Sequence, residues 1–117
     1  MAFNEKKQVG LYCSDVSGAF DKVCSQRLLQ KLYNAGIHPL LLKVLEAWLT
    51  ERIAYVVVHG EKSNLIKLID MVFQGTVLGP ALWNIFYADC SRPVQKQGYT
   101  ESIFADDLNC WKKSRVV

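Results

Sequence analysis

The stretch SIFADDLNCWK, residues 102–112, decides how the C-terminal part of this chain folds. Its two apolar segments flank Asp106 and Asp107 so closely that they predict a tight β-hairpin with both carboxylates at its turn. Adjacent carboxylates repel each other unless a cation or a shared proton offsets their charge. Asp is also a common turn residue, so the pair alone is more often structural. A functional site therefore needs a further partner.

Asp15 is the natural partner for this pair. Residues 9–16, VGLYCSDV, predict a buried strand that ends near Asp15, and a sheet would set that end beside the hairpin turn. Three converging carboxylates suit Mg²⁺, which keeps open positions that substrate phosphates complete. Two such ions about 4 Å apart activate an attacking hydroxyl and stabilise a leaving pyrophosphate. A plain strand-end cap is an equally good interpretation of Asp15 taken alone.

A glycine-rich loop precedes another predicted helix. Residues 73–80, FQGTVLGP, hold two glycines and a proline, and ALWNIFYADC (81–90) continues at helical spacing. Gly75 would let the backbone approach a flat base or sugar, and the Gln74 amide offers both a donor and an acceptor. Phe20 would form the wall of a substrate pocket. The structural alternatives are an ordinary turn for the loop and a core position for the phenylalanine.

The middle of the chain predicts two helices followed by a pair of strands. The elements are a helix over about 25–35 with Ser25 as its N-cap and Gly36 after its end, a helix from Pro39 to near Arg52, and two hairpin strands at 53–59 and 64–70. The complete order favours an α+β fold, in which helices pack on one face of a mainly antiparallel sheet.

Composition limits the class of protein. The chain has 117 residues, of which 50% are hydrophobic and 21% charged, so it is one globular domain or a piece of one. This excludes a disordered chain and a complete multidomain enzyme. The net charge of +3 is only weak support for a nucleic-acid partner.

The sequence lacks the residue patterns that are typical of several other functional classes. The four cysteines contain no CxxC pair, which excludes the usual zinc spacing, and the two histidines have no Ser or Cys at triad spacing. No segment is apolar for long enough to be a signal peptide or to cross a membrane, so we expect a soluble, intracellular protein without membrane contact. The residues that we expect in the core include Cys13, Cys24, Cys90 and Cys110, as reduced thiols, and Trp48, Trp83 and Trp111.

Three motifs in order carry a resemblance to a known family. DVSGAFDKV (15–23), FQGTVLGPALWNIFYAD (73–89) and FADD (104–107) resemble the reverse transcriptase family, in particular the palm of non-LTR, LINE-type retroelements. The resemblance covers about residues 9–113. It implies a polymerase palm-like α+β fold and an RNA-directed DNA polymerase, a nucleotidyltransferase that adds deoxynucleotides to a primer 3′-hydroxyl on an RNA template.

The resemblance also implies a metal site. Asp15 and Asp106 would bind two Mg²⁺ ions, for which Mn²⁺ substitutes, and Asp107 would be the third acidic residue of the family signature. Val16 would contribute a backbone carbonyl. These roles are implied by the family's motifs and not by the spacing of the residues.

A nucleotide site is implied in the same way. Phe20 would be the bulky residue that excludes a 2′-hydroxyl and so selects deoxynucleotides. Gln74 and Gly75 would line the incoming nucleoside triphosphate and the template base. The implied partners are an RNA template, a DNA primer and deoxynucleoside triphosphates.

The chain departs from the family pattern in two respects. Met71-Val72-Phe73 stands where the family usually has Gly-Val-Pro before the Gln. The sequence also begins just before the first palm motif and stops just after the last one, so the fingers and the thumb would be missing and the isolated piece would polymerise poorly.

Two other classes of protein remain as alternatives. The first is a retroelement remnant that catalyses nothing. The second is another acidic-pocket protein, such as a phospho-receiver or a two-metal nuclease. Receivers place their paired acids after the first strand, and a nuclease does not explain the Gln-Gly loop, so this alternative ranks last.

Overall fold

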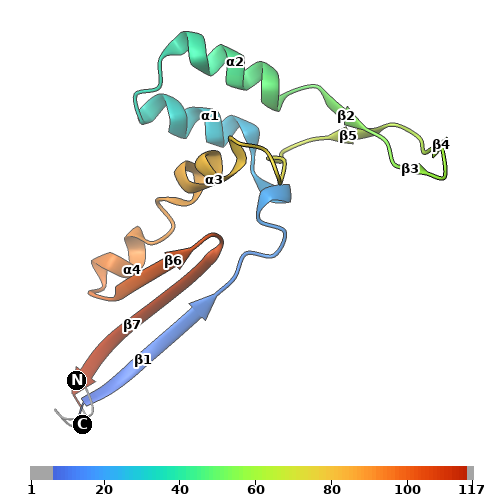
Figure 1. Cartoon of the computed structure of the whole chain (residues 1–117). Coiled ribbons are helices and arrows are strands. Elements are labelled where there is room, and N and C mark those ends of the chain that lie inside the picture. Colours follow the sequence, from blue (N-terminus) through green and yellow to red (C-terminus); the bar gives the residue numbers. More distant parts are fainter. Residues whose placement is uncertain (1–6, 116–117) are drawn as a thin grey trace. The chain divides into compact units, whose positions relative to one another are not determined.

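The structure, a computed structural model, describes residues 7–115 and has an α+β fold (Figure 1). Its chain divides into two compact units. Within the described residues, one unit comprises 7–17 together with 87–115, and the other comprises 18–86. The α+β class predicted from the sequence is confirmed, with antiparallel pairing throughout the three sheets of the described chain.

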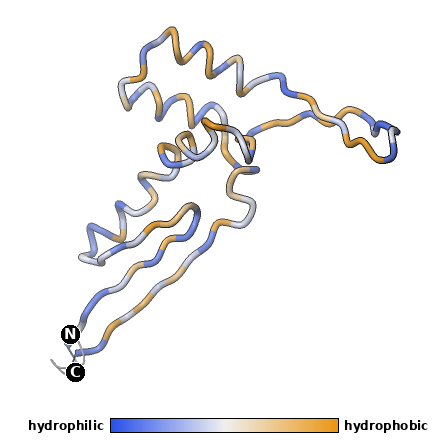
Figure 2. The backbone as a smooth tube through the Cα atoms, viewed as in Figure 1, coloured by the Kyte–Doolittle hydropathy of each residue, from blue (hydrophilic) through white to orange (hydrophobic). Residues whose placement is uncertain are grey.

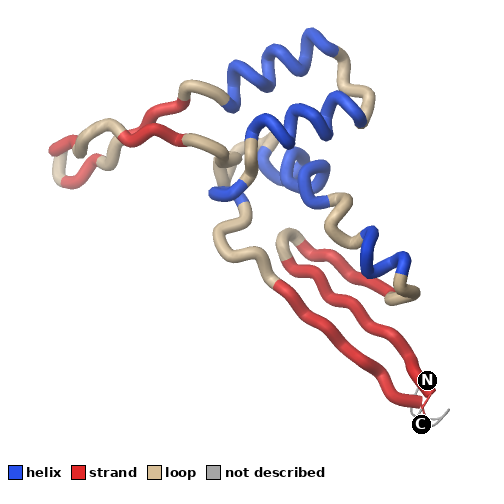
Figure 3. The backbone as a smooth tube through the Cα atoms, turned by 180° about the vertical axis from the view of Figure 1, so that it is seen from behind, coloured by secondary structure: helices blue, strands red, loops and turns tan. Residues whose placement is uncertain are grey.

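The first unit is built on a three-stranded sheet with the order β1-β7-β6, and Figure 3 shows these strands side by side. Its elements are β1 (Lys7–Ser14), α4 (Arg92–Lys96), β6 (Thr100–Phe104) and β7 (Asp107–Arg115). Ser14 lies opposite Leu108 at one end of the β1–β7 ladder, and Phe104 lies opposite Asp107 at the end of the β6–β7 hairpin. The hairpin and the first strand are therefore confirmed, but the prediction that this strand is buried was wrong, because most residues of β1 are exposed.

One face of this sheet is covered by α4, which packs against β6. Leu108 and Cys110, two residues apart on β7, are both buried, and they line a cavity together with Pro93 and Val94 of α4. Leu11 lies on the opposite face and is 66% exposed, as strand alternation requires. The sequence did not predict α4, because its five residues, RPVQK, carry no apolar period.

The second unit contains the longer helices. Its elements are the 3₁₀ turn η2 (Phe20–Lys22), α1 (Ser25–Asn34), α2 (Pro39–Leu49), β2 (Arg52–Ala54), β3 (Val57–Val58), β4 (Glu61–Lys62), β5 (Ile66–Leu68) and α3 (Gly79–Tyr87), whose last residue belongs to the first unit. Apolar side chains spaced three and four residues apart on the helices form the core. Its buried members are Leu28, Leu32, Leu45, Leu49, Leu82 and Trp83 on α1, α2 and α3, joined by Ala19, Val23 and Val72 outside these helices.

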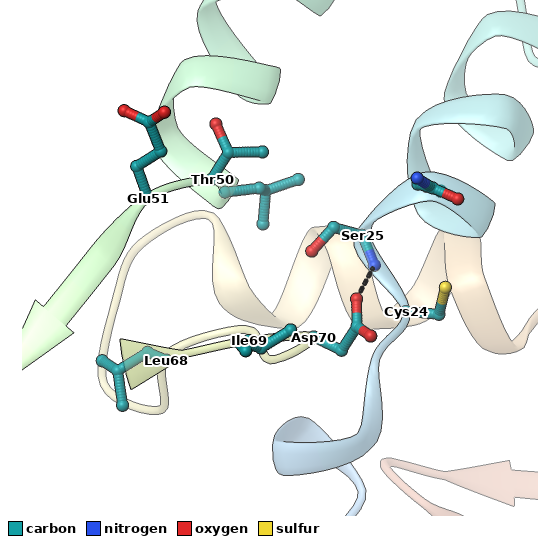
Figure 4. A pocket seen from close by; sticks show the side chains of 9 residues that line it. Cys24, Ser25, Thr50, Glu51, Leu68, Ile69 and Asp70 are labelled. Atoms are coloured by element: carbon teal, nitrogen blue, oxygen red, sulfur yellow. Dashed lines mark hydrogen bonds between the residues drawn. The ribbon is translucent and has the colours of Figure 1, made fainter. Parts of the chain in front are cut away.

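The start of α1 differs from the prediction. Ser25 is not the N-cap but the first helical residue, and Cys24 stands at the N-cap without a side-chain hydrogen bond. The backbone N–H of Ser25 instead donates to Oδ1 of Asp70, at 3.0 Å (Figure 4). A carboxylate far along the chain therefore satisfies one of the donors that a helix start leaves open. Gly36 follows the helix with φ 87°, as predicted.

α2 begins as predicted but ends earlier. Pro39 is its first residue, and Nδ1 of His38 accepts a hydrogen bond from the backbone N–H of Leu40 at 3.2 Å. The helix stops at Leu49 rather than near Arg52. Thr50 follows with an extended backbone, φ −108° and ψ 160°, which ends the helix, and Glu51 after it has φ 54°.

We expect Asp70→Ala to lower the free energy of unfolding by about 1 kcal/mol, the usual effect of losing a helix cap. Asp70 has φ 52°, which Asp and Asn tolerate better than Ala. Urea unfolding of the full chain measures the change. Asp70→Asn is the matched control, because it keeps an acceptor oxygen and should lose much less. Equal losses in the two variants would contradict the capping role.

The predicted hairpin over 53–70 is confirmed, but its strands are interrupted, and β4 lies where the loop between them was predicted. β2 pairs with β5 and β3 with β4, and between these ladders Val56 and Ser63 hold the strands together. The N–H of Ser63 donates to the carbonyl of Val56 at 2.9 Å, and the N–H of Val56 donates to the Ser63 hydroxyl oxygen at 2.9 Å. Figure 2 shows hydrophobic residues along the hairpin from β2 to β5. Many of them, such as Ile53 and Leu65, are exposed.

Some core predictions were wrong. Cys13 is exposed because it falls on the uncovered side of β1, and of the four cysteines only Cys110 is fully buried; none forms a disulfide. Of the three tryptophans, only Trp83 is buried, at 3% exposed, and Trp48 and Trp111 keep partial exposure. Among residues 7–115, no helix has the length and apolar character needed to cross a membrane.

Candidate metal centre and nucleotide loop

Three carboxylates meet at one end of the three-stranded sheet. Asp15 directly follows β1, Asp106 occupies the two-residue turn between β6 and β7, and Asp107 is the first residue of β7. One carboxylate oxygen from each lies within 4.8 Å of those from the other two. The register explains this convergence, because the pairing of Ser14 with Leu108 brings the end of β1 to the start of β7. The meeting of the three residues was predicted from the sequence.

The electrostatics of the cluster show unbalanced negative charge. The pKa of the Asp15 carboxyl is raised above its ordinary value, first by loss of hydration, then by a hydrogen bond with Asp106 and by the charges of Asp106 and Asp107. A hydrogen bond between two carboxyl groups requires a proton on one of them. A bound cation would offset the negative charge of the three carboxylates, and their oxygen donors fit a hard divalent ion.

The backbone of Val16 also reaches this site. A backbone hydrogen bond at Val16 lowers the pKa of Asp15, in opposition to the larger effects that raise it. This contact places main-chain atoms of Val16 beside the cluster. The ligand role of its carbonyl stays a prediction.

Tyr87 was missed by the sequence analysis. Its hydroxyl donates to the backbone carbonyl of Asp106 at 3.3 Å and also hydrogen-bonds with Cys90. Burial, followed by the hydrogen bond and nearby negative charges, raises the pKa of Tyr87 to about 12. The available signal was a phenol at the end of an apolar helix, where a buried hydroxyl needs a partner. The spacing of residues does not reveal which partner it finds.

We expect the tyrosine titration of the folded chain to contain a step near pH 12 that is absent from Tyr87→Phe. The folded pKa lies above the ordinary value of 10.0, so the unfolded chain loses this proton first. The contribution of Tyr87 to stability is therefore complete below pH 10.0 and is lost as the pH rises towards about 12. Ultraviolet absorbance of tyrosinate follows the step. An unchanged titration in Tyr87→Phe would contradict this assignment.

Phe20 lies in the helical unit, at the start of η2. Its ring stacks on Trp83, with ring centroids 5.5 Å apart, and its carbonyl accepts a hydrogen bond from the N–H of Val72 at 2.8 Å. These contacts attach Phe20 to the segment that leads into the glycine-rich loop. Its ring is only half-buried and packs on Trp83, as the core alternative predicted, and the pocket-wall role stays a prediction.

The loop before α3 is held by side-chain and backbone hydrogen bonds. The Thr76 hydroxyl donates to the Phe73 carbonyl at 2.8 Å and accepts from the Gly79 N–H at 3.2 Å. Gly75 has φ 77°, which favours glycine, and Gln74 and Gly75 are both exposed. The loop therefore presents the two predicted nucleotide-binding residues to solvent on a fixed turn.

Phe73, which departs from the resembled pattern, takes part in a cation–π stack. The Arg52 guanidinium lies 3.9 Å from the centroid of the Phe73 ring and 4.5 Å from that of Trp48. Burial lowers the pKa of Arg52, and its Nη1 is buried without a hydrogen-bond partner. The left-handed backbone conformation falls on Asp70 and not on Met71, so this turn does not need a glycine at position 71.

The sequence profile described as "Reverse transcriptase (RNA-dependent DNA polymerase)" matches residues 1–116. The chain belongs to the reverse transcriptase family. Two proteins that share this assignment are similar over almost the whole chain: the RNA-directed DNA polymerases from mobile element jockey of Drosophila melanogaster, 32% identical over 119 residues, and of Drosophila funebris, 31% identical over 122 residues. These alignments cover 97% and 99% of the chain, and the chain spans 13% of the length of each relative.

In this reverse transcriptase segment, we expect Arg52→Met to lower the free energy of unfolding by about 1 kcal/mol, because two cation–π contacts are lost. Methionine keeps the length and apolar stem of the side chain. The control is Lys67→Met on the paired strand β5, which should change stability by less than about 0.5 kcal/mol. A more stable Arg52→Met would mean that burial of the unpaired Nη1 outweighs both stacks.

Proposed function

We propose that this chain is the palm segment of an RNA-directed DNA polymerase from a LINE-type retroelement, which transfers deoxynucleotides to a primer 3′-hydroxyl on an RNA template. The observation that carries the proposal is the meeting of Asp15, Asp106 and Asp107 at one end of the sheet, with oxygen atoms within 4.8 Å, in a chain of the reverse transcriptase family. The two jockey polymerases, similar over nearly the whole chain, support the same activity.

The carboxylates have the chemistry needed for divalent ions. Asp15 and Asp106 would hold Mg²⁺ or Mn²⁺, with Asp107 and the Val16 carbonyl completing the ligand set. The chemistry supplied by the bound metal is activation of the primer 3′-hydroxyl and stabilisation of the leaving pyrophosphate. The raised pKa of Asp15 supports this role, because after desolvation it reflects the nearby Asp106 and Asp107 carboxyl groups, whose negative charge a cation would offset.

The nucleotide contacts would come from Phe20, Gln74 and Gly75. Phe20, fixed by its stack on Trp83, would exclude substrates that carry a 2′-hydroxyl. Gln74 and Gly75, exposed on the turn before α3, would contact the nucleotide and the template base. Both roles need a firm backbone, and the hydrogen bonds of Thr76 and Val72 provide one.

Primer extension by a chimera tests the proposal. Residues 9–113 replace the matching segment of the D. melanogaster jockey polymerase, to which the chain is 32% identical. We expect extension of a DNA primer on an RNA template in Mg²⁺, its loss when the metal is chelated, and its loss in the Asp106→Asn chimera. Glu61→Gln is the matched control, because it removes an exposed carboxylate of β4 outside the cluster.

The same assay distinguishes the polymerase from a catalytically dead remnant. A folded chimera that binds primer and template but extends nothing would show that this segment has lost activity. Preference for deoxynucleotides in the active chimera, relaxed by Phe20→Ala, would support the selector role. An unchanged preference in Phe20→Ala would overturn that role and leave the polymerase assignment standing.

A further inference from the structure

Asp106 lies in a turn that its own residues do not favour. β6 ends at Phe104 opposite Asp107, so Ala105 and Asp106 alone connect the strands. Ala105 has φ 53°, a left-handed conformation that two-residue hairpin turns usually give to glycine or asparagine. A strained non-glycine residue persists only where its surroundings hold it in place. The turn that carries the central carboxylate therefore needs outside support.

Tyr87 provides such support from a different element. It is the last residue of α3, and its hydroxyl reaches the backbone carbonyl of Asp106 at 3.3 Å in a partly buried position. A carbonyl oxygen only accepts, so the phenol O–H is the donor in this contact. Tyr87 also hydrogen-bonds with Cys90. The contact fixes the main chain of Asp106 and leaves its carboxylate available.

We propose that Tyr87 is a positioning residue, which holds the Ala105–Asp106 turn so that the Asp106 carboxylate meets those of Asp15 and Asp107. The inference rests on the proposed metal-dependent function and adds a residue to it. Tyr87 contributes no ligand atom. Its effect passes through the backbone of Asp106, and phenylalanine would fill the same space without holding the turn.

The test compares Mn²⁺ binding by the full chain and by Tyr87→Phe, followed through paramagnetic broadening of the amides near Asp15 and Asp106. We expect the variant to bind Mn²⁺ roughly three- to tenfold more weakly, the effect of losing one ordinary hydrogen bond. Ala105→Gly added to Tyr87→Phe should restore most of the affinity, because glycine adopts the left-handed conformation without strain. A general loss of packing would not be rescued by a glycine in the turn.

A second measurement follows the turn without metal. We expect backbone relaxation of Ala105 and Asp106 to show greater mobility in Tyr87→Phe, with the β1–β7 amides unchanged. Wild-type affinity and wild-type turn order in Tyr87→Phe would overturn the positioning role while the proposed function stands. A wild-type chain that binds no Mn²⁺ at the cluster would overturn the metal function instead, and the relaxation data would still decide whether Tyr87 orders the turn.

Discussion

Asp106→Asn is expected to reduce the affinity of the chain for Mn²⁺ at the acidic cluster by about tenfold or more, which corresponds to at least about 1.4 kcal/mol. The substitution keeps the size of the side chain and removes one of three negative charges whose oxygen atoms lie within 4.8 Å of one another. Affinity for hard divalent ions depends on the number of charged oxygen ligands. The hydrogen bond with Asp106 and the repulsion that raise the pKa of Asp15 should also weaken.

Paramagnetic broadening of backbone amides measures this effect by position. In the wild-type chain, amides at the end of β1 and at the β6–β7 turn should broaden together as Mn²⁺ is added. Glu61→Gln removes an equal charge from β4, outside the cluster, and should leave that pattern unchanged. Broadening in Asp106→Asn at wild-type Mn²⁺ concentrations would mean that Asp106 is not a ligand. Equal losses in both variants would mean that only net charge matters.

Gly79→Ala is expected to destabilise the chain by about 1–3 kcal/mol, the usual effect of forcing a group into occupied space. A Cβ atom at Gly79 would lie 2.8 Å from the Phe73 carbonyl oxygen and 2.9 Å from Oγ1 of Thr76. Both atoms belong to the hydrogen bonds that close the loop before α3. Because the nearest atom is a backbone carbonyl, the backbone of the loop must move to relieve the contact. Gln74 and Gly75 should therefore shift as well.

Thermal or urea unfolding gives the magnitude, and amide shifts of residues 73–79 show where the change lies. Gly10→Ala is the matched control, because no atom lies within 4 Å of a Cβ built there. In the jockey chimera, Gly79→Ala should also raise the KM for deoxynucleotides, since the displaced loop carries the predicted nucleotide contacts. Wild-type stability in Gly79→Ala would show that the loop moves aside without loss and that its hydrogen bonds are weak.

The candidate site was predictable to different degrees. The three carboxylates were predicted to lie close together, because each follows or precedes a short apolar segment. Strand pairing brings the ends of such segments to the same end of the sheet. The glycine-rich loop was predicted because glycine and proline mark turns directly. The stacks of Phe20 on Trp83 and of Arg52 on Phe73 were not predicted, because an aromatic residue in an apolar pattern does not reveal its partner.

The sequence by itself determined the family of this protein and most of its local elements: the strand that ends just before Asp15, the hairpin at Asp106, the longer helices, and the order of the motifs. Only the tertiary structure decided which distant residue completes each element. Asp70 accepts a hydrogen bond from the start of α1 across 45 positions, and the Tyr87 hydroxyl donates one to the Asp106 carbonyl across 19 positions. The physical reason is that the spacing of apolar residues indicates which face of a helix or strand is buried. A hydrogen bond between distant residues depends instead on where the tertiary fold places two separate backbone segments.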